Sequence, residues 1–150
     1  MIVNGKALLA AHPMNHMHGE KRKDLASGTS YGLSEAGYDV RLDGDVTLSE
    51  SNRFVLASTY ERFEMPNHLM AVVHDKSTHA RRGISVFNTV IEPGWSGWLT
   101  LEIVYHGTGE IIIPKGAGIA QVIFHKLTEP ANYGDGKYQN QERGPQEART

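Results

Sequence analysis

The stretch Trp98-Leu99-Thr100-Leu101-Glu102-Ile103-Val104-Tyr105 alternates in the way that is typical of a β-strand. Successive side chains of a strand point to opposite faces, so the two leucines, the isoleucine and the tyrosine share one face. The other face carries Glu102, a carboxylate in the middle of the strand. If that face is enclosed, burial raises the pKa of Glu102 towards the range useful for proton transfer. If it is open to water, Glu102 is an ordinary surface residue, and strand position alone favours this second interpretation.

Similar apolar or alternating segments occur on both sides, separated by glycine, proline, asparagine and aspartate. They cover residues 38–42, 54–60, 69–73, 84–87, 111–113 and 119–124. Segments of this length and spacing predict a mainly β domain. Helix is expected at only two short places, over 4–11 and 77–82, the second with Asp75 or Ser77 as its N-cap.

Length and charge limit the possible functions. A chain of 150 residues makes one domain, so we expect 1–150 to fold as a unit, with the polar residues 131–150 as a mobile tail. The net charge of −2 gives no basic field for binding nucleic acid. No apolar run approaches the roughly 20 residues of a membrane span, so we expect no membrane contact and a cytoplasmic location.

Metal binding is not indicated by the side chains alone. The sequence has no cysteine, which removes thiol nucleophiles and cysteine-ligated zinc. His12, His16 and His18 cluster near the N-terminus, but no carboxylate lies at ligand spacing. The sequence therefore predicts no metal site built from protein side chains.

A second polar group follows the apolar segment at 69–73. The residues are Lys76, Ser77, Thr78 and Arg81. Hydroxyls and cations at the start of a helical turn suit a polyphosphate. A solvated charged loop is the alternative, and composition alone favours it.

Five motifs follow one another between Ser30 and Gln141. They are SYGLS at 30–34 with GYDVRL at 37–42, KSTHARRG at 76–83, IEPGWSG at 91–97, LTLE at 99–102, and IAQ at 119–121 with KYQNQ at 137–141. Together they resemble the deoxycytidine triphosphate (dCTP) deaminase branch of the dCTP deaminase/dUTPase superfamily. Five motifs in order are far more specific than any one of them. They change the expectation for Glu102 from a surface residue to a catalyst.

The resemblance implies a distorted, jelly-roll-like β barrel of the dUTPase type, assembled as a homotrimer with sites between subunits. It implies zinc-independent hydrolytic deamination of dCTP to dUTP and ammonia, with Glu102 as general base and acid. The implied substrate is dCTP or a related deoxycytidine nucleotide, within pyrimidine deoxynucleotide metabolism. Mg²⁺ is implied only as an ion that enters with the triphosphate.

The resemblance also implies roles for single residues. The triphosphate and the attacking water are lined by Lys76, Ser77, Thr78 and Arg81, of which Ser77 and Arg81 join Glu102 as catalytic residues. Glu92 meets the deoxyribose, while Thr100 and Leu101 border the base through backbone groups. A tail that closes over the site contributes Tyr133, Lys137 and Gln141.

Three departures from the family pattern concern the site. Lys76 stands where arginine is usual, so the position offers a compact ammonium charge in place of a planar guanidinium group that can form two parallel hydrogen bonds. Glu92 replaces aspartate and reaches one methylene further. The segment at 84–91 is about two residues shorter than usual where the attacking water is held, which leaves open whether a modified cytosine is preferred.

Other functions remain open on the sequence. In a dUTPase, which converts dUTP to dUMP and diphosphate, Glu92 would be the base and Glu102 incidental. The Leu101-Glu102 pair, and the lack of the glycine-rich dUTPase tail, argue against that reading. A bifunctional deaminase and dUTPase stays open. A non-catalytic nucleotide-binding regulator is a further alternative, against which the intact Ser77, Arg81 and Glu102 argue.

Overall fold

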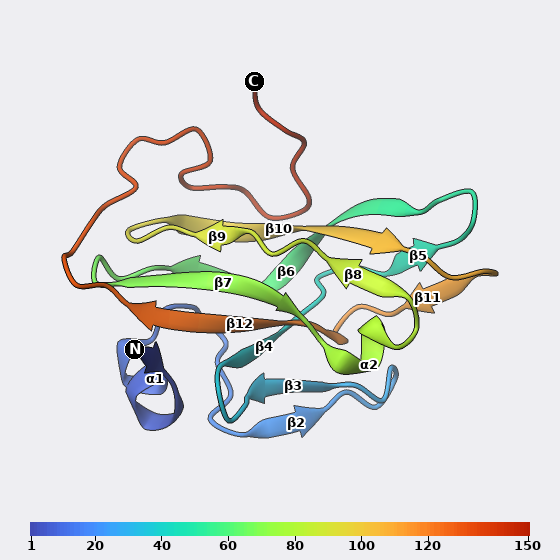
Figure 1. Cartoon of the computed structure of the whole chain (residues 1–150), viewed down its shortest axis with the longest axis horizontal. Helices are drawn as coiled ribbons and strands as arrows, with labels where there is room; N and C mark the ends of the chain where they lie inside the picture. The colour runs from blue at the N-terminus through green and yellow to red at the C-terminus, as the bar shows by residue number, and fades with distance from the viewer.

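The computed structural model describes all residues 1–150 and contains mostly strands (Figure 1). The strands are β1 (Ile2–Val3), β2 (Lys21–Lys23), β3 (Ser30–Leu33), β4 (Tyr38–Arg41), β5 (Val46–Leu48), β6 (Phe54–Glu64), β7 (Leu69–Asp75), β8 (Ile84–Val86), β9 (Val90–Ile91), β10 (Ser96–Tyr105), β11 (Ile111–Ile113) and β12 (Gly118–Lys126). The helices are α1 (Gly5–Ala11) and α2 (Ser77–Ala80). Both helices lie where the sequence predicts them.

The strands form three antiparallel sheets. The largest runs in the order β2-β3-β4-β12-β7-β9, with β1 paired to β12 as well. The second has the order β6-β10-β8, and the third joins β11 to β5. The predicted mainly β, jelly-roll-like fold is confirmed, with one correction. The strands do not close into a single barrel, because the hydrogen-bonded ladders stop at the edges of separate sheets.

The hydrophobic core lies between the two larger sheets. Leu101 and Ile103 of β10, Val73 of β7 and Phe124 of β12 are at most 1% exposed and belong to one cluster of buried side chains. Burying apolar area is the main favourable term in folding, so this cluster holds the sheets together. Neither helix is long and apolar enough to cross a membrane.

The connection between β8 and β9 passes from the small sheet to the large one. β8 pairs with β10, whereas β9 pairs with β7. At the crossing, the Phe87 amide donates to the Glu102 carbonyl at 3.0 Å. The Asp75 carboxylate accepts from the Val86 amide at 2.6 Å, which ties the end of β7 to β8. Asp75 therefore is not the N-cap of α2, and neither is Ser77: that position is Lys76, without a side-chain capping bond.

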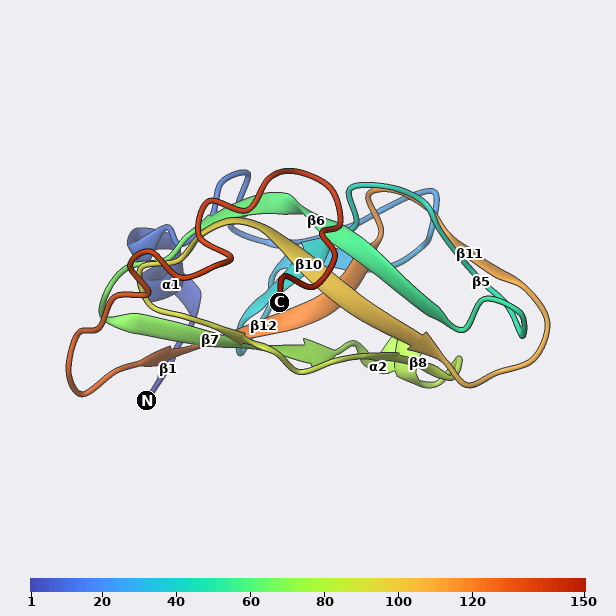
Figure 2. The same cartoon turned by 90° about the horizontal axis from the view of Figure 1, so that it is seen from above.

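The chain after β12 forms no further strand. Figures 1 and 2 show residues 127–150 turning back over β10, at the top of the molecule in Figure 1. The structure gives this segment one docked position. The expected mobility of 131–150 stays a prediction.

Candidate functional site

A cavity of about 450 Å³ lies under the C-terminal segment. Its walls come from β6, from β10, from the chain around β9, and from the segment after β12. The lining residues are Phe54, Leu56, Thr89, Val90, Ile91, Glu92, Trp95, Leu99, Thr100, Glu102, Tyr133, Tyr138, Gln141, Gln146, Glu147 and Ala148. This volume is within the range that small-molecule sites occupy in proteins.

Glu102 is the half-buried carboxylate of this cavity. Its Oε2 atom is fully buried and has no hydrogen-bond partner. Burial raises the pKa of Glu102, because a charged carboxylate is disfavoured away from water, and a hydrogen bond with its own backbone opposes the rise. The enclosed face that the sequence left undecided is therefore present.

The predicted alternation of β10 is confirmed, with one irregularity in the strand. Leu101, Ile103 and Tyr105 are buried in the core, on the face opposite Glu102. Leu99 is 8% exposed and belongs to the same core, but it also lines the cavity beside Thr100. The register between β10 and β6 shifts between Trp98 and Thr100, and such an irregularity changes where a side chain points.

Gln141 joins the C-terminal segment to β10 and is 6% exposed. Its side-chain amide donates to the Trp98 carbonyl at 2.8 Å and to Thr100 Oγ1 at 3.0 Å. The backbone carbonyl of Gln141 accepts from the Trp98 backbone amide at 3.1 Å. Gly97 has a φ of +146°, and a Cβ there would lie 2.7 Å from the Gln141 nitrogen. Only glycine therefore permits this approach of the tail to the strand.

Other tail contacts come from residues of the 91–97 and 137–141 motifs to which no individual role was assigned. Trp95 Nε1 donates to the Tyr138 carbonyl at 2.7 Å. The Gln139 side chain accepts from the Ser96 amide at 2.8 Å and donates to the Gly94 carbonyl at 2.9 Å. These bonds hold the segment over the cavity without a strand of its own.

The end of the chain also reaches the cavity. Arg143 donates two hydrogen bonds to Asp43, at 2.8 and 2.7 Å, and these bonds lower the pKa of Asp43. Beyond this pair, the Gln146 amide donates to Thr100 Oγ1 at 3.1 Å. This placement could not be predicted from the sequence, because polar residues after a turn show no periodicity.

The residues expected at the triphosphate lie outside the cavity. Ser77, Thr78 and Arg81 are exposed on α2 and the residue after it, and their side chains make no hydrogen bond or ion pair within the chain. In Figures 1 and 2, α2 lies at the end of β7 and beside β8, away from the C-terminal segment. One copy of the chain therefore does not bring these groups to Glu102.

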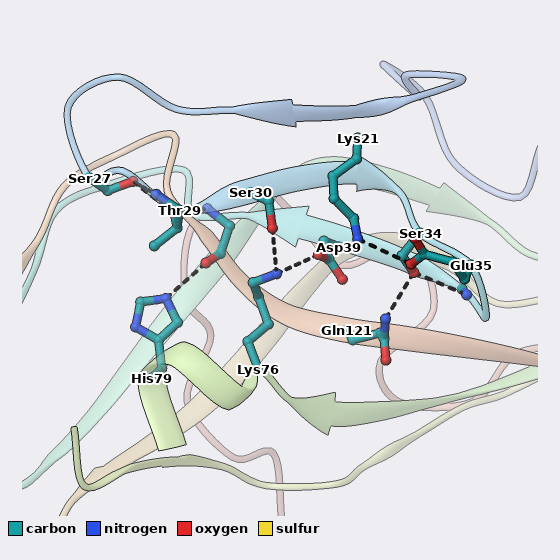
Figure 3. Close-up of polar contacts among 12 residues, drawn as sticks. Lys21, Ser27, Thr29, Ser30, Ser34, Glu35, Asp39, Lys76, His79 and Gln121 are labelled. Atoms are coloured by element: carbon teal, nitrogen blue, oxygen red, sulfur yellow. Dashed lines mark hydrogen bonds and ion pairs between the residues drawn. The ribbon is translucent and has the colours of Figure 1, made fainter. Parts of the chain in front are cut away.

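Lys76 is placed differently from its neighbours. Its ammonium group pairs with Asp39 of β4 and donates to Ser30 Oγ at 3.2 Å (Figure 3). The Lys76 and Asp39 side chains are only 10% and 4% exposed. Asp39 Oδ1 is buried with no partner at all.

His79 anchors the other end of α2. Its Nε2 atom donates to the Gly118 carbonyl at 2.8 Å, and the residue is 1% exposed (Figure 3). Burial lowers the pKa of His79, and the charges of Arg82 and Lys76 add to this effect, against the hydrogen bond to Gly118. The family motif gave no reason to single out His79.

His79 should make the protein less stable in mild acid. Its pKa is lower in the folded state than the ordinary 6.5, so the unfolded chain binds the proton first, and stability falls as the pH drops below about 6.5. Glutamine cannot take up this proton but can still donate to Gly118. Thermal unfolding followed by circular dichroism should show this difference. Between pH 7.5 and pH 5, the melting temperature of His79→Gln should fall by less than that of the unchanged protein. Replacing the exposed His68 by glutamine is the control, and equal acid sensitivity of His79→Gln and the unchanged protein would contradict the prediction.

The structure thus divides the expected site residues into three groups. Those at the cavity are Glu92, Thr100, Glu102, Tyr133 and Gln141. Those at or next to α2 are Lys76, Ser77, Thr78 and Arg81. The remaining two are Leu101, whose side chain is in the core, and Lys137, which is exposed and donates to the Arg149 carbonyl at 2.7 Å. No group of three or more His, Asp or Glu side chains is placed to hold a metal ion.

Comparison with known proteins gives one consistent family. Residues 39–127 match the model of the family described as dCTP deaminase-like. A dCTP deaminase from Campylobacter fetus subsp. fetus is 37% identical, in a match covering 75% of this chain and 78% of that protein. A dCTP deaminase from Gemmatimonas aurantiaca is 34% identical, in a match covering 85% of this chain and 90% of that protein.

Solved structures share the fold at low sequence identity. A 2'-deoxycytidine 5'-triphosphate deaminase from Agrobacterium tumefaciens aligns with a TM-score of 0.63 and 18% identity, over 84% of this chain and 48% of that one. A mutant dUTPase from phage phi11 of S. aureus, described with a structural Mg(II) ion, aligns with a TM-score of 0.57 and 15% identity, over 65% and 81%. Both activities therefore occur among proteins that share this fold.

Proposed function

Since the chain belongs to the dCTP deaminase family, we propose that it hydrolyses dCTP to dUTP and ammonia in pyrimidine deoxynucleotide metabolism. The observation that carries the proposal is the Glu102 carboxylate, with one buried oxygen that has no partner, in the wall of a cavity of about 450 Å³. A buried, unpartnered polar atom costs free energy, and such costs are typical of functional sites.

Glu102 acts as general base and then as general acid. It takes a proton from the water that attacks C4 of cytosine and delivers it to the ring nitrogen. It then takes the second proton from the new hydroxyl group on C4 and delivers it to the amino group, which leaves as ammonia while the C4 carbonyl forms. One water molecule is consumed and one ammonia leaves for each dCTP. A carboxyl group whose pKa burial raises suits both roles, because it holds a proton more readily than an ordinary carboxylate and can still release it. The chemistry is zinc-independent in this proposal, since Glu102 carries all of the proton transfer.

The other residues bind and orient the nucleotide. Glu92 contacts the deoxyribose, and the backbones of Thr100 and Leu101 contact the base. The tail residues Tyr133, Lys137 and Gln141 close over the bound nucleotide and exclude water. Two of these side chains, Tyr133 and Gln141, line the cavity with Glu102, which supports the assignment.

The triphosphate lies against Ser77, Thr78 and Arg81, of which Ser77 and Arg81 also hold the attacking water. Hydroxyls and a guanidinium group are strong donors to phosphate oxygens. These side chains are exposed and make no other bond in the chain. Mg²⁺ is held through the phosphate oxygens, which fits a chain without a cluster of acidic and histidine side chains.

The complete site forms between subunits of a homotrimer. Within one chain, the phosphate-binding residues of α2 and the Glu102 cavity lie on separate parts of the surface, so α2 of a second copy would complete the cavity. Phe54, Phe87 and Val90, which are 50% exposed or more, lie beside Glu102 and its neighbours and offer apolar area for such a contact. A trimer in light scattering at micromolar concentration is the expected result.

A second candidate function is supported by Glu92. This carboxylate is exposed at the same cavity and could activate water for hydrolysis of dUTP to dUMP and diphosphate. The deciding experiment incubates the protein with Mg²⁺ and either dCTP or dUTP and resolves dCTP, dUTP and dUMP by chromatography. A deaminase forms dUTP from dCTP, and a bifunctional enzyme forms dUMP from dCTP. A dUTPase forms dUMP only from dUTP, and a nucleotide-binding regulator forms no product.

A further inference from the structure

The ion pair between Lys76 and Asp39 makes Lys76 poorly available for binding a substrate phosphate. Both side chains are at least 90% buried, and the only other partner of the ammonium group is Ser30 Oγ at 3.2 Å. Opposite charges attract strongly where water is scarce, so Asp39 neutralises the charge that Lys76 would offer to a phosphate. To bind phosphate, Lys76 would have to leave a carboxylate whose second oxygen already lacks a partner.

The position of Lys76 in the chain suggests what the pair does. Lys76 joins β7 to α2, and its carbonyl accepts from the amides of His79 and Ala80, at 3.0 and 2.9 Å. Its side chain reaches across β12 to Asp39, since β12 lies between β7 and β4 in the sheet (Figure 3). The pair therefore fixes the residue from which α2 starts.

The single turn of α2 depends on such anchors. A helix of four residues is not stable by itself, because nucleation costs more than so few hydrogen bonds return. Lys76 holds one end, His79 holds the other through the Gly118 carbonyl, and Asp75 holds β7 to β8. The Lys76 and His79 side chains turn inward, while Ser77, Thr78 and Arg81 remain exposed on the same turn.

We propose that Lys76 and Asp39 are positioning residues: their ion pair orients α2, so that Ser77, Thr78 and Arg81 meet the substrate phosphates, and Lys76 itself does not contact phosphate. The proposal rests on the proposed function for the identity of the substrate. The arrangement of α2 that it describes can be measured without any substrate.

A double-mutant cycle separates positioning from direct binding. Lys76→Met leaves Asp39 as an unpaired buried charge, and Asp39→Leu does the same to Lys76, so each should raise KM for dCTP about tenfold or more. The double variant replaces the pair by two apolar side chains, which buried ion pairs often tolerate, and should return to within about threefold of the wild-type KM. Because Ser77 and Arg81 are also assigned to the attacking water, kcat should fall in the two single variants as KM rises, and both constants should recover together in the double variant. A merely structural defect would lower the active fraction, and so kcat, at constant KM.

Two results would overturn the proposal. If Lys76 binds phosphate directly, the double variant stays as impaired as Lys76→Met, and Asp39→Leu lowers KM by freeing the lysine. The control is Lys21→Met, which removes the same charge from an exposed pair with Glu35 in the same sheet and should leave KM unchanged. Ser30→Ala removes one hydrogen bond to Lys76 and should raise KM about threefold, which keeps the test available if the charge variants do not fold.

Hydrogen exchange of the nucleotide-free protein tests the same claim without activity. Amides of residues 77–83 should exchange faster in each single variant than in the wild type or in Lys21→Met, and should slow again in the double variant. Unchanged exchange in both single variants would contradict the positioning role. If the wild type does not release ammonia from dCTP, the proposed function fails, and this measurement still decides what the pair does.

Discussion

Replacing Glu102 by glutamine is expected to stop ammonia release from dCTP while the nucleotide still binds. Glutamine keeps the size of the side chain but cannot accept a proton from water and return it. General acid–base catalysis is worth about 10²- to 10⁴-fold, and a group that acts in both steps should reach the upper end. We therefore expect kcat to fall by about 10⁴-fold, measured as ammonia release in single-turnover and steady-state assays.

Binding should persist in Glu102→Gln because the groups assigned to the phosphates are untouched. Equilibrium binding of dCTP, measured by calorimetry, should remain within about tenfold of the wild type. The companion variant Glu92→Gln distinguishes the two activities. It should mainly weaken binding in a deaminase, whereas it should stop turnover in a dUTPase. Near wild-type ammonia release from Glu102→Gln would show that the proposed mechanism is wrong.

Truncation after Pro130 is expected to lower kcat/KM for dCTP at least about 100-fold while the sheets stay folded. The removed segment carries no strand, but it supplies Tyr133 and Gln141 to the cavity. Its loss opens the Glu102 side to water, which weakens every electrostatic interaction inside the site. Steady-state kinetics measure the loss, and circular dichroism checks the fold.

A shorter truncation, after Gly144, is the matched control. It keeps Gln141 and the Arg143–Asp43 pair. It removes only the last residues, including Gln146, whose backbone amide donates a hydrogen bond to Thr100 Oγ1. This protein should be at least as active as the full chain. If the truncation after Pro130 has unchanged kinetics, the tail has no part in the mechanism.

The sequence predicted the strands that carry a strong apolar or alternating pattern, and their positions agree with β4, β6, β7, β8, β10, β11 and β12. Among the strands that it missed are two whose residues show no such pattern. β2 consists of Lys21-Arg22-Lys23, is fully exposed at the sheet edge, and reads as a charged loop. β9 has two residues, of which Val90 is exposed, and it exists because the chain crosses there to pair with β7.

Only those parts of the candidate site that lie within a single sequence motif could be predicted from the sequence. Glu102 could be placed on a strand face by alternation, and the family resemblance then predicted a catalytic role for that residue. The pairing of Lys76 with Asp39 could not be predicted, because it depends on which strands are neighbours in the sheet and not on spacing along the chain. The approach of Gln146 to Thr100 was invisible for the same reason.

The Arg143–Asp43 pair gives the tail a second fixed end. The segment after Ala131 is attached to the sheets at its N-terminal end through β12, and near its C-terminal end through the two hydrogen bonds from Arg143 to Asp43. A chain tied at both ends explores a small volume, and closing a loop of this length costs only about 2 kcal/mol of entropy. When the hydrogen bonds between Gln141 and Trp98 break, Gln141 therefore stays close to the strand. Its high effective concentration there favours re-formation of the same bonds. In the proposed enzyme, opening of the site would then follow the nanosecond-to-microsecond motion of a loop, and each turnover would avoid the slower capture of a free chain end.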